Sequence, residues 1–230
     1  MIKKRLKLIL LGVVLFLISY LSIAAIWANS VTGELLQRTP SANHQIAIQP
    51  QHLAALIKIE DPKFYQHHGL NISKGQGLTT ITSVVARDIF LHYQDLEGVK
   101  GAFQSFYRAV FNCCKRIDLG RDVMAIVLGF HATKQQQLNF FINNAYWGTM
   151  NGQGVIGMEA AARAYYDKDV LDLTDDEFYG IIAMLISPNY YHPIVNPELH
   201  AERVQKIKAV VAGQCRASGW LDLTYDHCYP

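Results

Sequence analysis

The sequence predicts a mainly α-helical protein in which one domain follows an N-terminal transmembrane helix. Three observations support this: a long uncharged run near the N-terminus, apolar residues at helical spacing through much of the remainder, and capping patterns at several expected helix starts. The chain has 230 residues, of which 50% are hydrophobic, so it is long enough for one medium-sized domain with a substantial core. We find no internal repeat and no clear succession of strands.

The N-terminus combines a basic cluster with an apolar run. Four basic residues come first: Lys3, Lys4, Arg5 and Lys7. The uncharged run 8–28 is long enough to cross a bilayer as a helix, and the basic cluster is expected to stay in the cytoplasm. Residues 1–28 are therefore predicted to anchor the chain in the cytoplasmic (inner) membrane in a single pass, with a periplasmic or extracellular domain. A cleaved signal peptide is the alternative, because Ser22 and Ala24 offer a small-residue cleavage site.

The charge balance argues against a nucleic-acid partner. The chain has 21 basic and 19 acidic residues, but four of the basic ones belong to the N-terminal cluster, which leaves 17 against 19 for the remainder. A domain without a net positive charge lacks the electrostatic footprint of nucleic-acid binding. No cysteine–histidine spacing is typical of a zinc site, while Cys215 and Cys228 are the plausible disulfide pair in an outward-facing domain.

The domain is expected over residues 50–230, because residues 29–49 are polar and irregular and are predicted to form a linker. Its first helix is indicated by four residues at the spacing of one helix face: Leu53, Leu56, Ile57 and Glu60. Pro62 is expected to end or bend this helix.

Further helices are expected in order along the domain. Their starts are indicated by an apolar face from Ile81 to Ile89, the capping boxes Thr133-x-x-Gln136 and Thr174-x-x-Glu177, and the pair Asn196-Pro197. The last of these helices is predicted to run to about Ser218, with Gly219 as its C-terminal stop.

Glu60 stands where the helical period calls for an apolar residue. A carboxylate in that position is partly desolvated, which raises its pKa toward the range useful to a general base. Asp61 beside it faces elsewhere and is expected to cap the helix or bind a cation. The structural alternative is a Glu at a helix end that pairs with Lys63 or a histidine, and these residues alone leave both interpretations open.

Glu60-Asp61-x-x-Phe64-x-x-His67-x-Gly69 resembles the first signature of the family 51 peptidoglycan glycosyltransferases. These are lysozyme-like transglycosylases found in bifunctional penicillin-binding proteins and as monofunctional membrane-anchored enzymes. Further stretches resemble the family's other signatures in the right order: Gly77-Leu-Thr79-Thr80-Ile81-Thr82, Phe141-Ile142-Asn143 with Tyr146 and Gly148, Gly157-Met-Glu159-Ala160-Ala161, and Leu173 to Pro193. The resemblance covers roughly Gln49 to Trp220 and implies a lysozyme-like transglycosylase domain. The anchor and single domain are similar to the monofunctional type.

The resemblance implies polymerisation of lipid II, a disaccharide–pentapeptide on undecaprenyl pyrophosphate. The 4-hydroxyl of one sugar attacks the anomeric carbon of the growing chain, and the pyrophosphate leaves. Glu60 maps onto the family's catalytic base. Substrate binding is further predicted for Asp61, Phe64, His67, Thr79, Thr80, Thr82, Arg87, Lys134 and Asn143. A structural role is the alternative for His67, which matches the family motif, and for Lys134, which follows the cap at Thr133. A helix N-terminus at Thr79–Thr80 is expected to aim free N–H groups at phosphate oxygens. The implied partners are lipid II, undecaprenyl pyrophosphate-linked glycan, the membrane and cell-wall synthases.

The sequence departs from the family in its second and third signatures. Ser83 and Val84 replace the two glutamines of the second signature, and the spacer before it, residues 70–76, is shorter than usual. The two Glu positions of the family's third signature fall at Arg121 and Gly129. The family's acid assists the leaving pyrophosphate, often through a divalent metal, so Mg²⁺ is the one cofactor to consider and no metal ligand is assigned.

These departures leave two functions open. One is polymerisation with Glu60 as base, and the other is a catalytically impaired member that binds lipid II or cell-wall synthases as a scaffold. Lys115, Arg116 and Arg121 either bring positive charge to a pyrophosphate or form a solvated basic face near anionic lipid. Hydrolysis of a sugar polymer is disfavoured, because a glycosidase normally needs two placed carboxylates.

Overall fold

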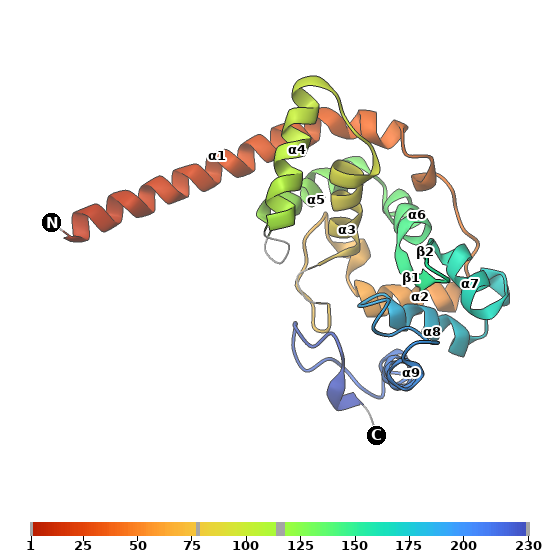
Figure 1. Ribbon diagram of the computed structural model, residues 1–230. Helices are drawn as coiled ribbons and strands as arrows, with labels where there is room; N and C mark the ends of the chain where they lie inside the picture. Colours follow the sequence, from red (N-terminus) through yellow and green to blue (C-terminus); the bar gives the residue numbers. More distant parts are fainter. Residues whose placement is uncertain (1, 77–78, 114–117, 229–230) are drawn as a thin grey trace.

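The computed structural model describes residues 2–76, 79–113 and 118–228. The fold is mainly α-helical, as predicted: a long helix, α1 (Ile2–Gln37), projects from a body of shorter helices and one β-hairpin (Figure 1). The helices of the body are α2 (Pro50–Glu60), α3 (Ile81–Arg87), α4 (Gly98–Cys113), α5 (Leu119–His131), α6 (Lys134–Asn144), α7 (Met158–Tyr166), α8 (Asp175–Met184) and α9 (Pro197–Val211). Gly77, Leu78, Lys115 and Arg116 lie outside the described residues.

Helix α1 joins an exposed apolar segment to a segment that packs on the body. Within the described chain it is the one helix long and apolar enough to cross a membrane, and its side chains from Leu6 to Ile18 are exposed. The irregular structure predicted from residue 29 is wrong as far as Gln37, because the helix continues. Ala28, Val31 and Leu35 recur at helical spacing and are fully buried in the part of α1 that packs on the body, so their burial stabilises these turns.

The predicted helix starts are confirmed by their caps. The side chain of Thr133 accepts a hydrogen bond from the backbone N–H of Gln136, and Thr174 does the same for Glu177. In both cases the side chain of the third residue returns a bond to the cap, which completes the capping box. Each such cap satisfies backbone N–H groups that the first helical turn leaves unpaired.

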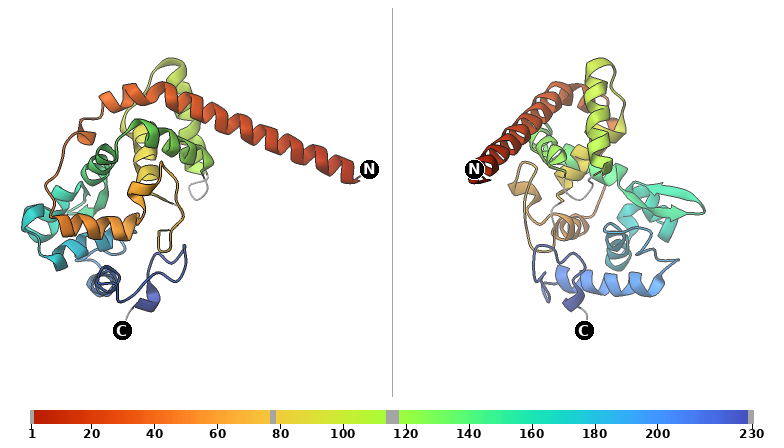
Figure 2. Two further views of the ribbon diagram at one scale, coloured as in Figure 1. Left: turned by 180° about the vertical axis from the view of Figure 1, so that it is seen from behind. Right: turned by 60° about the vertical axis from the view of Figure 1, so that its left-hand side comes forward.

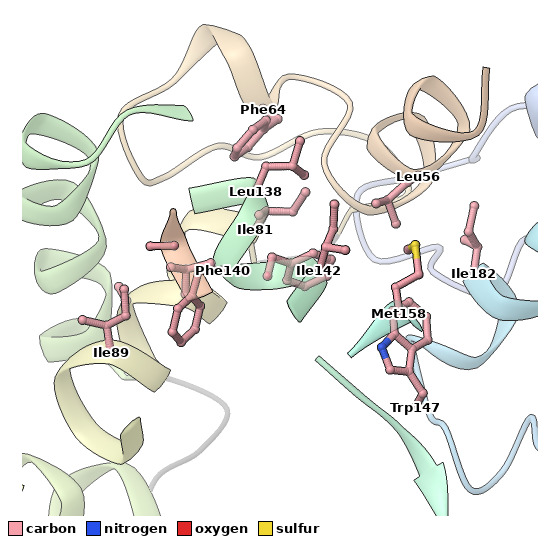
Figure 3. Close-up of a cluster of buried hydrophobic side chains, with 14 of the residues drawn as sticks. Leu56, Phe64, Ile81, Ile89, Leu138, Phe140, Ile142, Trp147, Met158 and Ile182 are labelled. Carbon is pink, nitrogen blue, oxygen red and sulfur yellow. The ribbon is translucent and has the colours of Figure 1, made fainter. Parts of the chain in front are cut away.

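A single hydrophobic core among the described residues packs α2, α3 and α6 together. Figure 3 shows labelled members of this cluster: Leu56, Phe64, Ile81, Ile89, Leu138, Phe140, Ile142, Trp147, Met158 and Ile182. Burial of each such side chain contributes about 1.5–3 kcal/mol. The core therefore fixes the C-terminal end of α2, where Glu60 lies, relative to the N-terminal end of α3.

The β-hairpin is an element that the helical pattern did not predict. Strand β1 (Tyr146–Met150) pairs antiparallel with β2 (Gln153–Ile156), and Met150 lies opposite Gln153. The turn residues Asn151 and Gly152 have φ of 52° and 77°. Positive φ at both turn positions matches the right-handed twist of the two strands and is the usual reason for an Asn-Gly pair. The hairpin projects from the body (Figure 2).

Helix α9 begins at Asn196-Pro197 as predicted but ends earlier than expected. It stops at Val211, and Gly213, with φ of 76°, takes the left-handed position that was expected of Gly219. The backbone N–H of Gly213 bonds the carbonyl of Val210 at 3.0 Å, which closes the last turn. The chain then folds back, and the predicted disulfide between Cys215 and Cys228 is confirmed.

Candidate active site

Glu60 is the last residue of α2, and Asp61 fixes the chain as it leaves the helix. Asp61 is fully buried and accepts hydrogen bonds from the backbone N–H of Ile81 at 3.1 Å and from His67 Nε2 at 3.0 Å. Burial raises the pKa of Asp61, and the neighbouring His67 opposes that rise. Asp61 therefore ties the end of α2 to the start of α3, and this connection sets the position of Glu60.

Glu60 lies at the edge of the buried face of α2. The fully buried face consists of His52, Ala55, Leu56 and Ile59, whereas Glu60 is half-buried. Burial raises the pKa of Glu60 to about 7, with Arg203 opposing the rise and Asp61 adding to it. A carboxylate with this pKa is partly ionised at neutral pH and still basic enough to accept a proton, which suits a general base.

Two cavities meet at Glu60. The smaller chamber has a volume of about 340 Å³ and is lined by residues that include Gly75, Gln76, Thr79, Thr80, Arg203 and Leu223. The larger chamber has a volume of about 740 Å³, and its lining includes Asp88, His92, Phe111, Asn144 and Tyr146. Glu60 and Arg87 line both chambers. The cleft thus places one carboxylate and one guanidinium between two spaces that can each hold part of a substrate.

Arg203 is a cleft residue that sequence reasoning missed. It projects from α9, is 3% exposed and donates from Nη1 to the carbonyl of Leu223 at 2.7 Å. Its guanidinium lies over the rings of Tyr191 and Tyr225, at 5.6 and 5.3 Å from the ring centroids. The sequence pattern that identified Glu60 could also have identified Arg203, because a charged residue stands at a buried position of its helix, three residues after buried His200.

Three of the predicted substrate-binding residues line the cleft. Thr79 and Thr80 line the smaller chamber, and Arg87 donates from Nε to Asp88 at 2.6 Å while it lines both chambers. The hydroxyl of Thr80 is already bonded to the carbonyl of Gly69 and caps α3. Of the three, Thr79 and Arg87 therefore keep the most capacity for a ligand.

At the start of α3, where free phosphate-binding N–H groups were expected, several of these donors already have protein partners. The N–H of Ile81 bonds Asp61, and the N–H of Ser83 bonds the Thr80 hydroxyl at 3.0 Å. The buried Thr82 hydroxyl donates to Gln137 at 2.7 Å. A helix N-terminus binds anions only through N–H groups that lack protein partners, so the bonded amides do not serve a phosphate, and phosphate binding at this terminus stays a prediction.

The remaining predicted residues support the cleft and line neither chamber. Phe64 is fully buried, and Lys134 lies 4.3 Å from the centre of its ring. His67 bonds Asp61, and Asn143 donates to the carbonyl of His44 at 2.8 Å. Burial lowers the pKa of Lys134, whereas Asp61 raises it. These four side chains hold neighbouring segments together, and direct substrate contact by them stays a prediction.

The structure explains why the third signature lacks its acid at position 129. A Cβ atom built on Gly129 would lie 2.0 Å from the carbonyl oxygen of His68, so no side chain fits. The His68 ring also stacks on Phe130 at a centroid distance of 4.7 Å. Arg121, at the other acidic position, is nearly buried and bonds Asp122 at 2.7 Å, so it is not part of a solvated face. The short loop after His67 thus occupies the space that a carboxylate would need.

Among the described residues, the cleft does not bring three carboxylate, histidine or cysteine side chains close enough together to hold a metal ion. Among the described residues, one group of three ligand-type side chains lies close enough to hold a metal, and it consists of Cys215, His227 and Cys228. Its cysteines form the disulfide, and soft sulfur ligands do not suit Mg²⁺. Mg²⁺ prefers oxygen ligands in octahedral geometry, which the described side chains do not present as a cluster.

Comparison with known proteins places this chain in a family. Residues 31–212 match the family model described as Transglycosylase. The chain is 29% identical over 174 residues to penicillin-binding protein 1F of Bacillus subtilis, which covers 70% of this chain and 21% of that protein. It is 26% identical over 171 residues to penicillin-binding protein 1B of Vibrio cholerae, covering 68% and 19%. The chain spans about a fifth of the length of these relatives. Since the match takes in most of its residues, the chain belongs to the transglycosylase family.

Proposed function

We propose that the protein is a peptidoglycan glycosyltransferase that polymerises lipid II, with Glu60 as the general base. The observation that carries the proposal is the half-buried Glu60 carboxylate, with its pKa of about 7, at the junction of the two chambers. The membership of the transglycosylase family supports the same reaction class.

In the proposed reaction, Glu60 takes the proton of the attacking 4-hydroxyl. The oxygen forms a bond with the anomeric carbon of the growing chain, and the bond from that carbon to the pyrophosphate oxygen breaks. The electron pair leaves with the lipid-linked pyrophosphate, whose charge is stabilised by Arg87 from its place between the chambers. A fixed guanidinium is effective there because the partly enclosed cleft screens it less than bulk water does.

We further propose that α1 crosses the cytoplasmic membrane, with its basic end inside and the domain in the periplasm or outside the cell. The length and exposed apolar surface of α1 support this. Val99, Phe103 and Phe106 of α4 are also exposed, and Phe103 and Phe106 line an apolar cavity of about 400 Å³ against α1. The disulfide fits an oxidising compartment.

A catalytically impaired scaffold that binds lipid II or cell-wall synthases is the second candidate. The contact between Gly129 and His68 favours it, because no acid of the third signature fits there. An impaired member would still bind the lipid-linked sugar but would not join two of them.

The two candidates are separated by incubation of the detergent-purified protein with labelled lipid II and Mg²⁺. The wild type is run on a gel beside Glu60→Gln and a surface control, Glu198→Gln on α9. Glycan polymer from the wild type and the control, lost in Glu60→Gln, supports catalysis by Glu60. No polymer from any of them, with lipid II binding intact in all three, rejects catalysis in favour of the scaffold.

A further inference from the structure

After α9 the chain forms a loop that the family match does not include. The match ends at residue 212, and residues 215–228, called here the C-terminal loop, are closed by the Cys215–Cys228 disulfide. Asp222 organises the loop by accepting hydrogen bonds from the N–H groups of Ser218 at 2.8 Å and Tyr225 at 3.1 Å. The loop is therefore an ordered structure with internal bonds rather than a loose tail.

The C-terminal loop docks on the smaller chamber. The carbonyl of Leu223 accepts the bond from Arg203 Nη1 at 2.7 Å, and Leu223 is among the residues that line the chamber. On the other wall, the N–H of Gly75 donates to the carbonyl of Gly219 at 2.9 Å. The buried ring of Tyr225 lies against Arg203 and leaves no room for a side chain at Gly75. The loop thus holds Arg203 from one side while it closes the chamber.

Two hydrogen-bond donors at this chamber lack protein partners. In the described chain, Arg203 Nε and Gln76 Nε2 are buried without an acceptor, although both residues line the smaller chamber. Gln76 is 5% exposed, so neither side chain is freely solvated. A buried donor without an acceptor is costly, and a ligand oxygen would remove that cost.

The charges around the smaller chamber favour an anion. Its lining contains the guanidinium groups of Arg87 and Arg203 against the single carboxylate of Glu60. Asp88 accepts a hydrogen bond from Arg87, but Asp88 lines the larger chamber and not the smaller one. Among the described residues that line this chamber, Glu60 is the one carboxylate that faces Arg203, while Asp226 acts on Arg203 from outside the chamber.

We propose that the C-terminal loop completes an anion-binding subsite in the smaller chamber, where Arg203 and Gln76 bind phosphate or carboxylate oxygens of the substrate. The identity of that substrate as a lipid-linked sugar rests on the proposed function. Tyr225 and the disulfide are positioning groups, because they act through Arg203. A phosphate comes from the lipid carrier and a carboxylate from the peptide stem, so the two sources are distinguishable.

The test measures binding of two probes to the full-length protein in detergent by isothermal titration calorimetry. Inorganic pyrophosphate represents the carrier, and N-acetylmuramyl pentapeptide, which has no phosphate, represents the peptide stem. Arg203→Gln removes the charge, and Lys208→Gln is the matched control, because Lys208 lies on α9 and pairs with Asp176 away from the chamber. We expect Arg203→Gln to weaken one probe about tenfold or more, the usual effect of losing a hydrogen bond to a charged group.

Two further samples separate binding from folding. If Arg203→Gln proves poorly folded by circular dichroism, Arg203→Lys takes its place in the comparison. Arg203→Lys keeps the charge and should retain part of the affinity for the probe. Reduction of the disulfide in the wild type leaves Arg203 in place but releases the loop, and it should weaken the same probe. Equal affinities of Arg203→Gln and Lys208→Gln for both probes, or no binding of either probe to the wild type, would overturn the proposal.

Failure of this inference differs from failure of the proposed function. If the wild type binds a probe through Arg203 but makes no polymer from lipid II, the subsite stands and the glycosyltransferase proposal falls. If the wild type makes polymer and Arg203→Gln does so with unchanged KM, the subsite falls and the glycosyltransferase proposal stands.

Discussion

The contact between Gly129 and the His68 carbonyl makes a quantitative prediction about Gly129→Ala. The new methyl group would lie 2.0 Å from the His68 oxygen and 2.5 Å from its carbonyl carbon, whereas ordinary contact begins at 3.4 Å. The backbone of one segment must therefore move by about 1.4 Å relative to the other. Both partners are main chain, so rotation of a side chain cannot relieve the clash.

The size of the effect follows from two opposing terms. Overpacking of this kind costs about 3 kcal/mol at the upper end of its range. Replacing a helical glycine with alanine returns about 1 kcal/mol through helix propensity. The net loss of about 2 kcal/mol lowers the melting temperature of a chain of this size by about 4–8 °C.

Thermal unfolding in detergent, followed by circular dichroism, measures this loss. Gly33→Ala is the matched control, because Gly33 lies in α1 and its added Cβ would meet nothing within 4 Å. The control should melt at or slightly above the wild-type temperature. Gly129→Glu, which restores a family acid, should be destabilised at least as much as Gly129→Ala and gain no polymerisation. A stable Gly129→Glu with increased polymerisation would refute the reasoning.

Four further predictions concern the site and one helix cap. Because Glu60 must be ionised to act as a base, the polymerisation rate should rise with pH through about 7 and then level off; a rate independent of pH from 5 to 9 would contradict this. Because folding raises the pKa of Glu60, the protonated side chain stabilises the folded state at pH values below the pKa of the unfolded chain. This stabilisation is lost as the pH rises through about 7. Glu60→Gln should therefore melt above the wild type at pH 8 but close to it at pH 4, and equal melting at pH 8 would speak against the shift. Asp61→Ala should lose about 1–3 kcal/mol of unfolding free energy in urea titration, because it leaves the buried Ile81 N–H unpaired. Thr174→Ala should lose about 1 kcal/mol through its cap, and an unchanged urea midpoint would show that the cap is not needed.

Local signals predicted much of the fold. The capping boxes at Thr133 and Thr174 gave helix starts, because a cap depends on residues only three positions apart. Glu60 was found because a carboxylate interrupted an apolar helix face. The Asn151-Gly152 turn was also readable, but its strands have only 5 and 4 residues and were too short to show a clear alternation.

The features that escaped prediction depend on distant contacts. Gly129 touches His68, and Arg203 meets Glu60 only after α9 has packed beside α2. Sequence spacing does not reveal which distant segment of the chain packs against the Cα atom of a glycine. The supporting roles of Thr82 and Asn143 likewise depend on bonds to Gln137 and to residues of the segment before α2, so a motif match alone could not separate them from substrate contacts.

The continuity of α1 has a mechanical consequence if this helix crosses the membrane as we propose. The buried turns between Ala28 and Gln37 belong to the same helix as the apolar segment, so the helix joins the bilayer to the body without a flexible linker between them. At about 1.5 Å per residue, these turns amount to a stiff stalk about 15 Å long. The cleft would then be held at a fixed height and in a fixed orientation above the lipid surface. A growing glycan strand would therefore leave the protein in a fixed direction.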